Sequence, residues 1–179
     1  LFLKKSPEKK KFKISANPYK RKNKNAPEIK NFTKKAYQYF GGVDLMAIEG
    51  VSHITVLGIM SEIGEEGFFK FKTAKHFTSW LRLAPNNKIS GGKVLSNKLP
   101  KGSNRLKIAL RQAANSIGNL KDTELSDFFK RIAYRRGRQA AVSATARKLA
   151  VIIWNMITKK QPYNPPSIYM FRDEKRKLG

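Results

Sequence analysis

The run of residues 67–120 contains no Asp or Glu, yet it carries eleven Lys and Arg residues. Charge of one sign along so much of a chain repels itself in the folded state unless counter-charge lies nearby. The whole chain has the same imbalance, with a net charge of +26 at pH 7 and a pI near 10.5. Nucleic acid is the commonest source of such counter-charge, and an anionic membrane surface is the alternative.

Length and apolar content bound the fold. A chain of 179 residues that is 40% apolar is one domain of ordinary size with enough material to close a core. Its most apolar run, 149–157, is far shorter than the roughly twenty residues of a spanning helix, so no membrane partner is expected. No signal peptide is visible, which predicts a cytoplasmic or nucleoid location. Because the chain begins with Leu1, we expect that an upstream portion is missing.

The residues that hold metals or act as nucleophiles are scarce. There is no cysteine, which excludes disulfides, thiolate catalysis and Cys-ligated zinc, and His53 and His76 are too few for a His-rich metal site. The carboxylates between residues 36 and 160 show no spacing typical of a two-metal nuclease. The sequence therefore predicts no metal or other cofactor within this chain.

The chain divides into three parts by composition. Residues 1–35 hold thirteen Lys and Arg with several prolines, which favours a mobile basic arm, or equally a solvated linker to something upstream. Residues 36–160 have apolar side chains at helical spacing and form the predicted domain. Residues 161–179 follow with three further prolines and predict an irregular tail.

A helix-hairpin-helix element is predicted at about residues 43–64. Asp44 is placed to cap a short first helix, and a second helix is expected over 53–63 with Ile54, Leu57 and Ile63 inward and Gly64 as its C-cap. The turn between them presents backbone N–H groups from Gly50, Val51 and Ser52, which in such elements contact a DNA phosphate. A plain turn between two helices is the alternative, because Glu49 brings a like charge close to any phosphate.

The remaining pattern predicts an all-α fold of four to six helices with one irregular basic loop or small hairpin. The other helices are expected at 73–83, 104–117, 123–136 and 139–158. Cationic side chains on the last two are interpreted as a phosphate-tracking surface, with a solvated face as the alternative: Arg131, Arg135, Arg136, Arg138, Arg147 and Lys148.

The loop at 85–102 is the main candidate site. It places Ser90 between Lys88 and the pair Gly91-Gly92, and Lys93 follows. Glycines let a backbone approach phosphate closely, so Ser90 is a turn residue, a phosphate-holding hydroxyl or a nucleophile that forms a phosphoserine bond. We expect Lys88, Gly91, Gly92 and Lys93 to bind phosphate or stabilise its charge. The same is expected of four further residues: Lys98, Lys101, Arg105 and Arg111.

Several motifs together resemble one family. They are GGVDL with IEGV, SEIG, KHF with WL, LAPNNKISGGKVL, NRL with ALRQAA, FFKR and ATARKLA. In this order, over about residues 23–160, they resemble the C-terminal transposase domain of the insertion-sequence-110 family of bacterial mobile elements. The segment NKISGGK carries most of the weight of the resemblance.

The resemblance implies a DNA recombinase that inserts and excises its element. It implies that Ser90 becomes covalently joined to a DNA end, that an element-encoded guide RNA and DNA are partners, and that the intact protein is a homo-oligomer. The family's RuvC-like N-terminal domain, with its DEDD carboxylates and Mg²⁺, is absent from this sequence, so the chain alone is expected to be inactive. A non-catalytic helix-hairpin-helix module that binds DNA or RNA, or a decayed transposase remnant, is the alternative.

Overall fold

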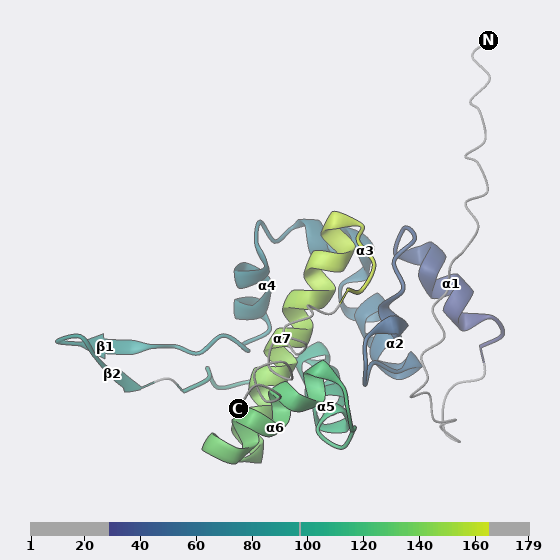
Figure 1. Cartoon of the computed structure of the whole chain (residues 1–179). Coiled ribbons are helices and arrows are strands. Elements are labelled where there is room, and N and C mark those ends of the chain that lie inside the picture. The colour runs from purple at the N-terminus through teal and green to yellow at the C-terminus, as the bar shows by residue number, and fades with distance from the viewer. Residues whose placement is uncertain (1–28, 97, 165–179) are drawn as a thin grey trace, which may run out of the picture.

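The computed structural model describes residues 29–96 and 98–164, and these form a helical body with one projecting hairpin (Figure 1). The helical elements are α1 (Phe32–Tyr39), the 3₁₀ turn η1 (Leu45–Ala47), α2 (His53–Glu62), α3 (Gly64–Phe69), α4 (Ala74–Trp80), α5 (Arg105–Ile117), α6 (Glu124–Arg136) and α7 (Arg138–Lys159). The strands are β1 (Lys88–Ser90) and β2 (Lys93–Ser96). The all-α prediction is confirmed, although the described residues form seven α-helices where four to six were expected.

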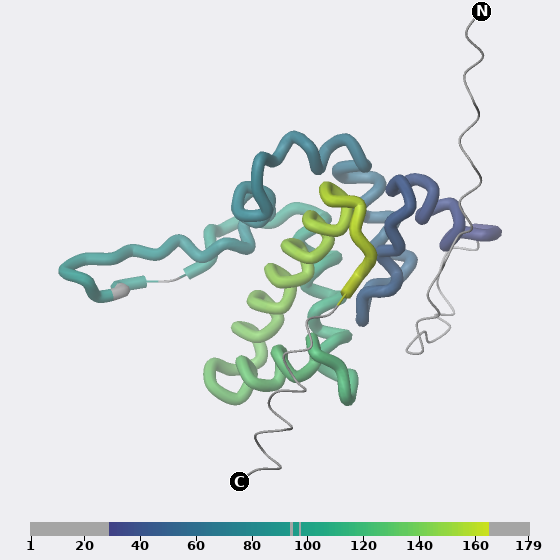
Figure 2. The backbone as a smooth tube through the Cα atoms, turned by 45° about the horizontal axis from the view of Figure 1, so that its top comes forward, coloured from purple at the N-terminus to yellow at the C-terminus, as the bar shows by residue number. Residues whose placement is uncertain are grey.

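Helix α7 is the centre of the body. It runs its full length against its neighbours, packing on α5 and α6 along one part and on α3 and α4 along another (Figures 1 and 2). Its inward side is buried at Ala141, Ala146, Leu149, Ala150 and Ile153. The alanines allow close approach of the neighbouring helices, and the larger residues fill the space between them.

Helix α7 also corrects one sequence expectation. At 22 residues it is long and apolar enough to cross a membrane by length and composition alone, which the short run at 149–157 did not indicate. Half of its apolar window is buried inside the body. In the structure, the apolar side of α7 packs against α5 and α6.

The N-terminal boundary of the body lies earlier than predicted. Residues 32–35 were placed in the basic arm, but they form the start of α1, where Phe32 and Ala36 are buried. The rest of the expected arm, residues 1–28, and the tail beyond residue 164 lie outside the described residues.

The expected helix-hairpin-helix is reduced at its first helix. Asp44 does cap the chain there, accepting from the Met46 N–H at 2.9 Å, but it begins only the single turn η1. The second helix, α2, agrees with the prediction, although Ile54 is exposed rather than inward. Gly64, at φ +65°, ends α2 as predicted, directly after the C-cap Ile63, and α3 begins at the same residue.

Helices α4, α5 and α6 each begin directly after an N-cap residue. Thr73, Asn104 and Thr123 each accept a hydrogen bond from the backbone N–H three residues later, at 3.3, 2.7 and 3.2 Å. These hydroxyls and this amide satisfy N–H groups that a helix start leaves unpaired. The predictions of α4, α5, α6 and α7 are confirmed within one to three residues at each end.

Candidate nucleic-acid interface

The candidate loop folds as a two-stranded hairpin that stands clear of the body (Figures 1 and 2). Strands β1 and β2 are antiparallel, with Ile89 opposite Val94 and Ser90 opposite Lys93. Gly91 and Gly92 form the two-residue turn with φ values of +52° and +73°. Two positive φ values are the signature of the type I′ turn, so the turn conformation alone accounts for both glycines. A Cβ at either position would meet nothing within 4 Å.

Ser90 lies on a cationic face of this hairpin. Lys93 is directly opposite across the strands, and Lys88, two residues earlier in β1, shares the same face because side chains alternate along a strand. Ser90 and both lysines are exposed. The opposite face presents Ile89, which is 63% exposed. The structure thus brings Ser90, Lys88 and Lys93 together, open to an external ligand.

The hairpin is closed at its base by backbone contacts. The Asn86 N–H donates to the Lys98 carbonyl at 3.0 Å, and the Arg82 guanidinium donates to the Lys101 carbonyl. Lys98 and Lys101 have exposed side chains along the returning strand. They continue the basic surface from the hairpin toward the start of α5.

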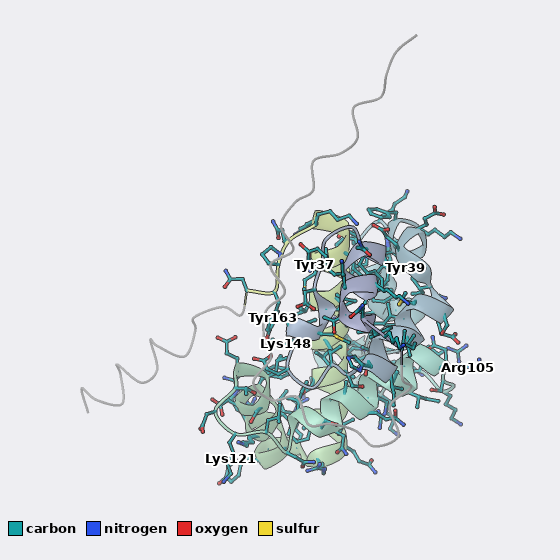
Figure 3. The ribbon with its side chains drawn as sticks, turned by 90° about the vertical axis from the view of Figure 1, so that its right-hand side faces the viewer. Tyr37, Tyr39, Arg105, Lys121, Lys148 and Tyr163 are labelled. Atoms are coloured by element: carbon teal, nitrogen blue, oxygen red, sulfur yellow. The ribbon has the colours of Figure 1, made fainter. Side chains whose placement is uncertain are left out.

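Arg105, the first residue of α5, forms an ion pair with the body. Its guanidinium lies 3.8 Å from a carboxylate oxygen of Glu62 on α2, and its side chain is 90% exposed. The hairpin projects from the side of the body away from α2 (Figure 1), and Figure 3 shows Arg105 at the edge of the body. That Arg105 stabilises phosphate at Ser90 therefore stays a prediction.

The turn at Gly50, Val51 and Ser52 is also separate from the hairpin. A Cβ at Gly50 would come within 2.5 Å of Ile117 and 3.0 Å of the Ala113 carbonyl oxygen, so this turn packs closely on α5. Val51 is buried, with its N–H donating to the Ile48 carbonyl at 3.2 Å. Ser52 caps α2 through the Thr55 N–H. These contacts favour the plain turn between helices over a phosphate-binding one.

Beside this turn lies a cluster of ionisable groups that the sequence did not predict. The Tyr163 hydroxyl donates to Glu49 at 2.6 Å, and burial raises the pKa of Tyr163, with the hydrogen bond to Glu49 raising it further. Burial also lowers the pKa of Lys148, which lies near Tyr163 in Figure 3, and raises that of Glu124. The sequence could not predict this cluster, because Tyr163 and Glu49 are 114 residues apart and meet only in the folded chain.

The cations of the last helices are partly engaged within the body. Lys148 and Arg131 lie over the Phe128 ring, at 4.5 and 5.8 Å from its centroid. Arg138 donates to the Asn115 side chain at 2.7 Å and lies over Phe129. Such cation–π and amide contacts account for these three side chains without an external anion, whereas Arg135 and Arg136 are exposed in the last turn of α6.

A second cationic region lies at the base of the hairpin. Lys107 is only 6% exposed, and its ammonium donates to the Gly102 carbonyl at 3.0 Å. Arg111, one helical turn later on α5, donates to the Ser143 hydroxyl at 2.8 Å. The sequence predicted Arg111 as a phosphate ligand but not Lys107; their spacing of four residues, which places both on one helix face, was the available signal.

The fit of a metal ion can be tested on the same residues. Within 29–96 and 98–164 no three His, Cys, Asp or Glu side chains gather where they could hold a metal ion. The Mg²⁺ that the resemblance implies for a RuvC-like domain therefore does not fit the donor set of these described residues.

The described residues thus define a class: an all-helical domain that presents a serine on an exposed, basic hairpin. Residues 44–130 match the sequence model of the Transposase IS116/IS110/IS902 family. This segment spans the chain from η1 to the middle of α6 and includes the whole hairpin. The resemblance to this family is therefore confirmed over that segment.

Two curated relatives agree with the family match. The chain is 27% identical over 126 residues to the "Probable family 20 transposase" of Pseudomonas aeruginosa, covering 68% of this chain and 36% of the relative. It is 28% identical over 123 residues to the transposase for insertion sequence element IS1111A of Coxiella burnetii, covering 66% and 33%. The chain spans about a third of the length of these relatives.

Proposed function

We propose that this chain is the nucleic-acid-binding, serine-bearing C-terminal domain of an insertion-sequence transposase, and that Ser90 attacks a DNA phosphodiester. The single observation that carries the proposal is the exposure of Ser90 on the face of a projecting hairpin that also bears Lys88 and Lys93. A hydroxyl that served only the turn would not need two cations beside it, since Gly91 and Gly92 already supply the turn conformation.

The proposed chemistry is a transesterification in two balanced steps. Ser90 Oγ bonds to phosphorus while one bond from phosphorus to a sugar oxygen breaks, and that oxygen takes up a proton as it leaves. Residues 88–96 contain no His, Asp or Glu, so the hydroxyl proton passes to a base supplied from outside the hairpin. A DNA hydroxyl then attacks the phosphoserine, and Ser90 leaves as the restored hydroxyl.

The lysines act on charge. Lys88 and Lys93 flank Ser90 and stabilise the negative charge that grows on the non-bridging phosphate oxygens as the pentavalent state forms. Lys98 and Lys101 contact backbone phosphates further along the same strand and hold it in place. The base and any metal belong to other parts of an intact transposase, so we expect this chain alone to bind DNA without cleaving it.

The experiment uses a full-length transposase that contains this domain. Ser90→Ala is expected to bind its DNA normally but to lose strand cleavage, strand joining and the covalent protein–DNA adduct seen on a denaturing gel with labelled DNA. Ser96→Ala is the matched control, because Ser96 lies on the same hairpin and accepts from the Lys98 N–H. Joining that survives in Ser90→Ala, or that is lost only in Ser96→Ala, contradicts the assignment of Ser90 as the nucleophile.

A non-catalytic binding module or a decayed remnant is the second candidate. The absence of any general base in residues 88–96 favours it, since a bare serine hydroxyl is a weak nucleophile. An upstream open reading frame with spaced Asp and Glu residues would favour the enzyme. Sequencing the DNA that flanks the gene separates the two candidates.

The wider roles follow from the transposase assignment. We propose DNA and an element-encoded guide RNA as partners, a homo-oligomer as the working form, and the bacterial cytoplasm, next to the nucleoid, as the location. The net charge of +26 suits binding to either nucleic acid. Pull-down of the full-length protein with its element transcript would test the RNA, and size-exclusion chromatography with light scattering would test the oligomer.

A further inference from the structure

A shallow groove lies on the outer surface of α5, beside the start of α7. Its volume is about 470 Å³, which falls within the size range of small-ligand sites. The side chains around it that matter for binding are cationic, apolar or neutral polar: Ser103, Lys107, Ile108, Arg111, Asn115 and Val142. The groove is separate from the face of the hairpin that carries Ser90.

The cations of this groove crowd one another. Lys107 is almost fully buried, and its ammonium donates to a neutral carbonyl, that of Gly102. Burial lowers its pKa below the usual lysine value, and the positive charges of Arg111 and Arg82 lower it further. A desolvated ammonium beside two guanidinium groups is costly to keep charged, and an anion bound among them would reverse that cost.

The two helices that border the groove have no acidic side chain to neutralise this positive charge. Neither α5 (Arg105–Ile117) nor α7 (Arg138–Lys159) contains an Asp or Glu, and the run 67–120 that leads into the groove has none either. Glu62 forms an ion pair with α5, but it does so with Arg105, at the first residue of the helix. Arg111 is bound to a hydroxyl, that of Ser143, rather than to a carboxylate.

We infer that this groove binds a phosphodiester of a nucleic-acid backbone, held by Lys107 and Arg111. Both side chains lie on one face of α5, and each carries donors that its neutral protein partners leave available. Ile108, which is 49% exposed, and Val142 supply an apolar wall for the sugar, and Asn115 and Ser103 supply neutral hydrogen-bonding groups at the rim. This inference rests on the proposed function and adds to it a second contact point.

The groove also has a fixed relation to the hairpin. Lys107 holds the Gly102 carbonyl, and Arg82, just after α4, holds the adjoining Lys101 carbonyl, so the segment that returns from β2 is tied to the groove at Gly102 and to the body at Lys101. A strand whose phosphate lies in the groove therefore runs toward the base of the hairpin. The groove positions that strand relative to Ser90, and Lys107 and Arg111 are positioning residues rather than catalytic ones.

The test measures binding of the whole chain by fluorescence anisotropy. The probes are a short labelled DNA duplex, the corresponding single DNA strand and the corresponding RNA strand, each titrated at several salt concentrations. Lys107→Met and Arg111→Met are each expected to weaken binding about tenfold on at least one probe, as for a lost charge-assisted hydrogen bond. The slope of log affinity against log salt should become shallower by about 0.9 in each variant.

Lys121→Met is the matched control. It removes the same charge from an exposed position beyond the far end of α5, and Figure 3 shows Lys121 well separated from Arg105 at the near end. Its affinity should change less than about twofold, with an unchanged salt slope. The probe on which the groove variants lose most identifies the strand, DNA or RNA, that the groove holds.

The outcomes are distinct. If the chain binds the probes but both groove variants behave as Lys121→Met does, the groove inference is wrong and the proposed function stands. If the unaltered chain binds none of the probes, the proposed function itself fails. If Lys107→Met melts early because the tie to Gly102 is lost, Arg111→Met, which keeps that tie, decides the matter on its own.

Discussion

The helical body and the hairpin differ in how far their side chains are buried. In the body, residues such as Phe77, Leu110 and Leu149 are almost fully buried, and capped helices satisfy the backbone. On the hairpin every residue whose side chain is described is exposed or partly exposed, including Ile89 and Leu95. Burial therefore explains the body completely and explains none of the hairpin. The hairpin is held without a core and is open to contacts outside the molecule, and each prediction below tests that contrast.

The largest effect on stability is expected in the body. Leu149→Ala empties a fully buried position at the centre of α7 and should cost about 3 kcal/mol of unfolding free energy. Leu95→Ala removes the same atoms from a side chain that is 68% exposed and should cost less than about 0.5 kcal/mol. Urea denaturation followed by circular dichroism measures both. A comparable loss in the two variants would show that the hairpin packs on the body in solution.

Two glycines sharpen the same contrast. Gly50→Ala forces a side chain into φ +74° and against Ile117 and the Ala113 carbonyl, so it should destabilise the body by about 2 kcal/mol. Gly91→Ala meets the same kind of strain at φ +52° but has open space around it. It should speed hydrogen exchange in the hairpin while the melting temperature of the body stays unchanged. If Gly91→Ala lowers that temperature as much as Gly50→Ala does, the two regions fold as one unit.

The hairpin lysines should affect binding and leave stability alone. About six phosphate contacts would give the unaltered chain a slope of log affinity against log salt near −5. The double variant Lys88→Met/Lys93→Met should make that slope shallower by about 1.8, with an unchanged melting temperature. Salt titrations of DNA binding measure it. A slope that the double variant leaves unaltered would mean that the hairpin does not lie against phosphate.

The smallest effect expected is a pH dependence that belongs to Lys107. Its pKa is lowered in the folded chain from the usual 10.5, so between the two values the unfolded chain binds more protons. The contribution of Lys107 to stability therefore rises as pH increases through its folded-state pKa. The unfolding free energy of the unaltered chain, relative to that of Lys107→Met, should rise as the pH is raised toward 10.5. A constant difference would contradict the lowered pKa.

The sequence predicted those parts of the molecule that depend on neighbours along the chain. Helix starts could be predicted from their N-cap residues, because a cap involves only the next three residues. Such caps are Thr73, Asn104 and Thr123. Gly91-Gly92 likewise indicates the hairpin, since a two-residue turn sets its own backbone angles. The break at Ile63 and the exposure of Ile54 depend on how α2 meets the rest of the body, and no local pattern encodes that.

The candidate site divides in the same way. Ser90, Lys88 and Lys93 could be placed together because six adjacent residues build their shared face. Arg105 could not be assigned, since its partner Glu62 lies 43 residues earlier on another helix. The bond from Tyr163 to Glu49 and the groove at Lys107 join segments that only packing brings together.

The irregular pairing within the hairpin has one more consequence. Ile89 pairs with Val94 while Lys88 pairs with Ser96, so β2 contains one residue more than β1 at that step. Because side chains alternate, inserting a single residue into the Gly91-Gly92 turn would offset β2 by one against β1 and move Lys93 from the flank of Ser90 to the flank of Ile89. The length of the turn therefore decides whether Lys93 lies beside the Ser90 hydroxyl or on the other flank of the ribbon.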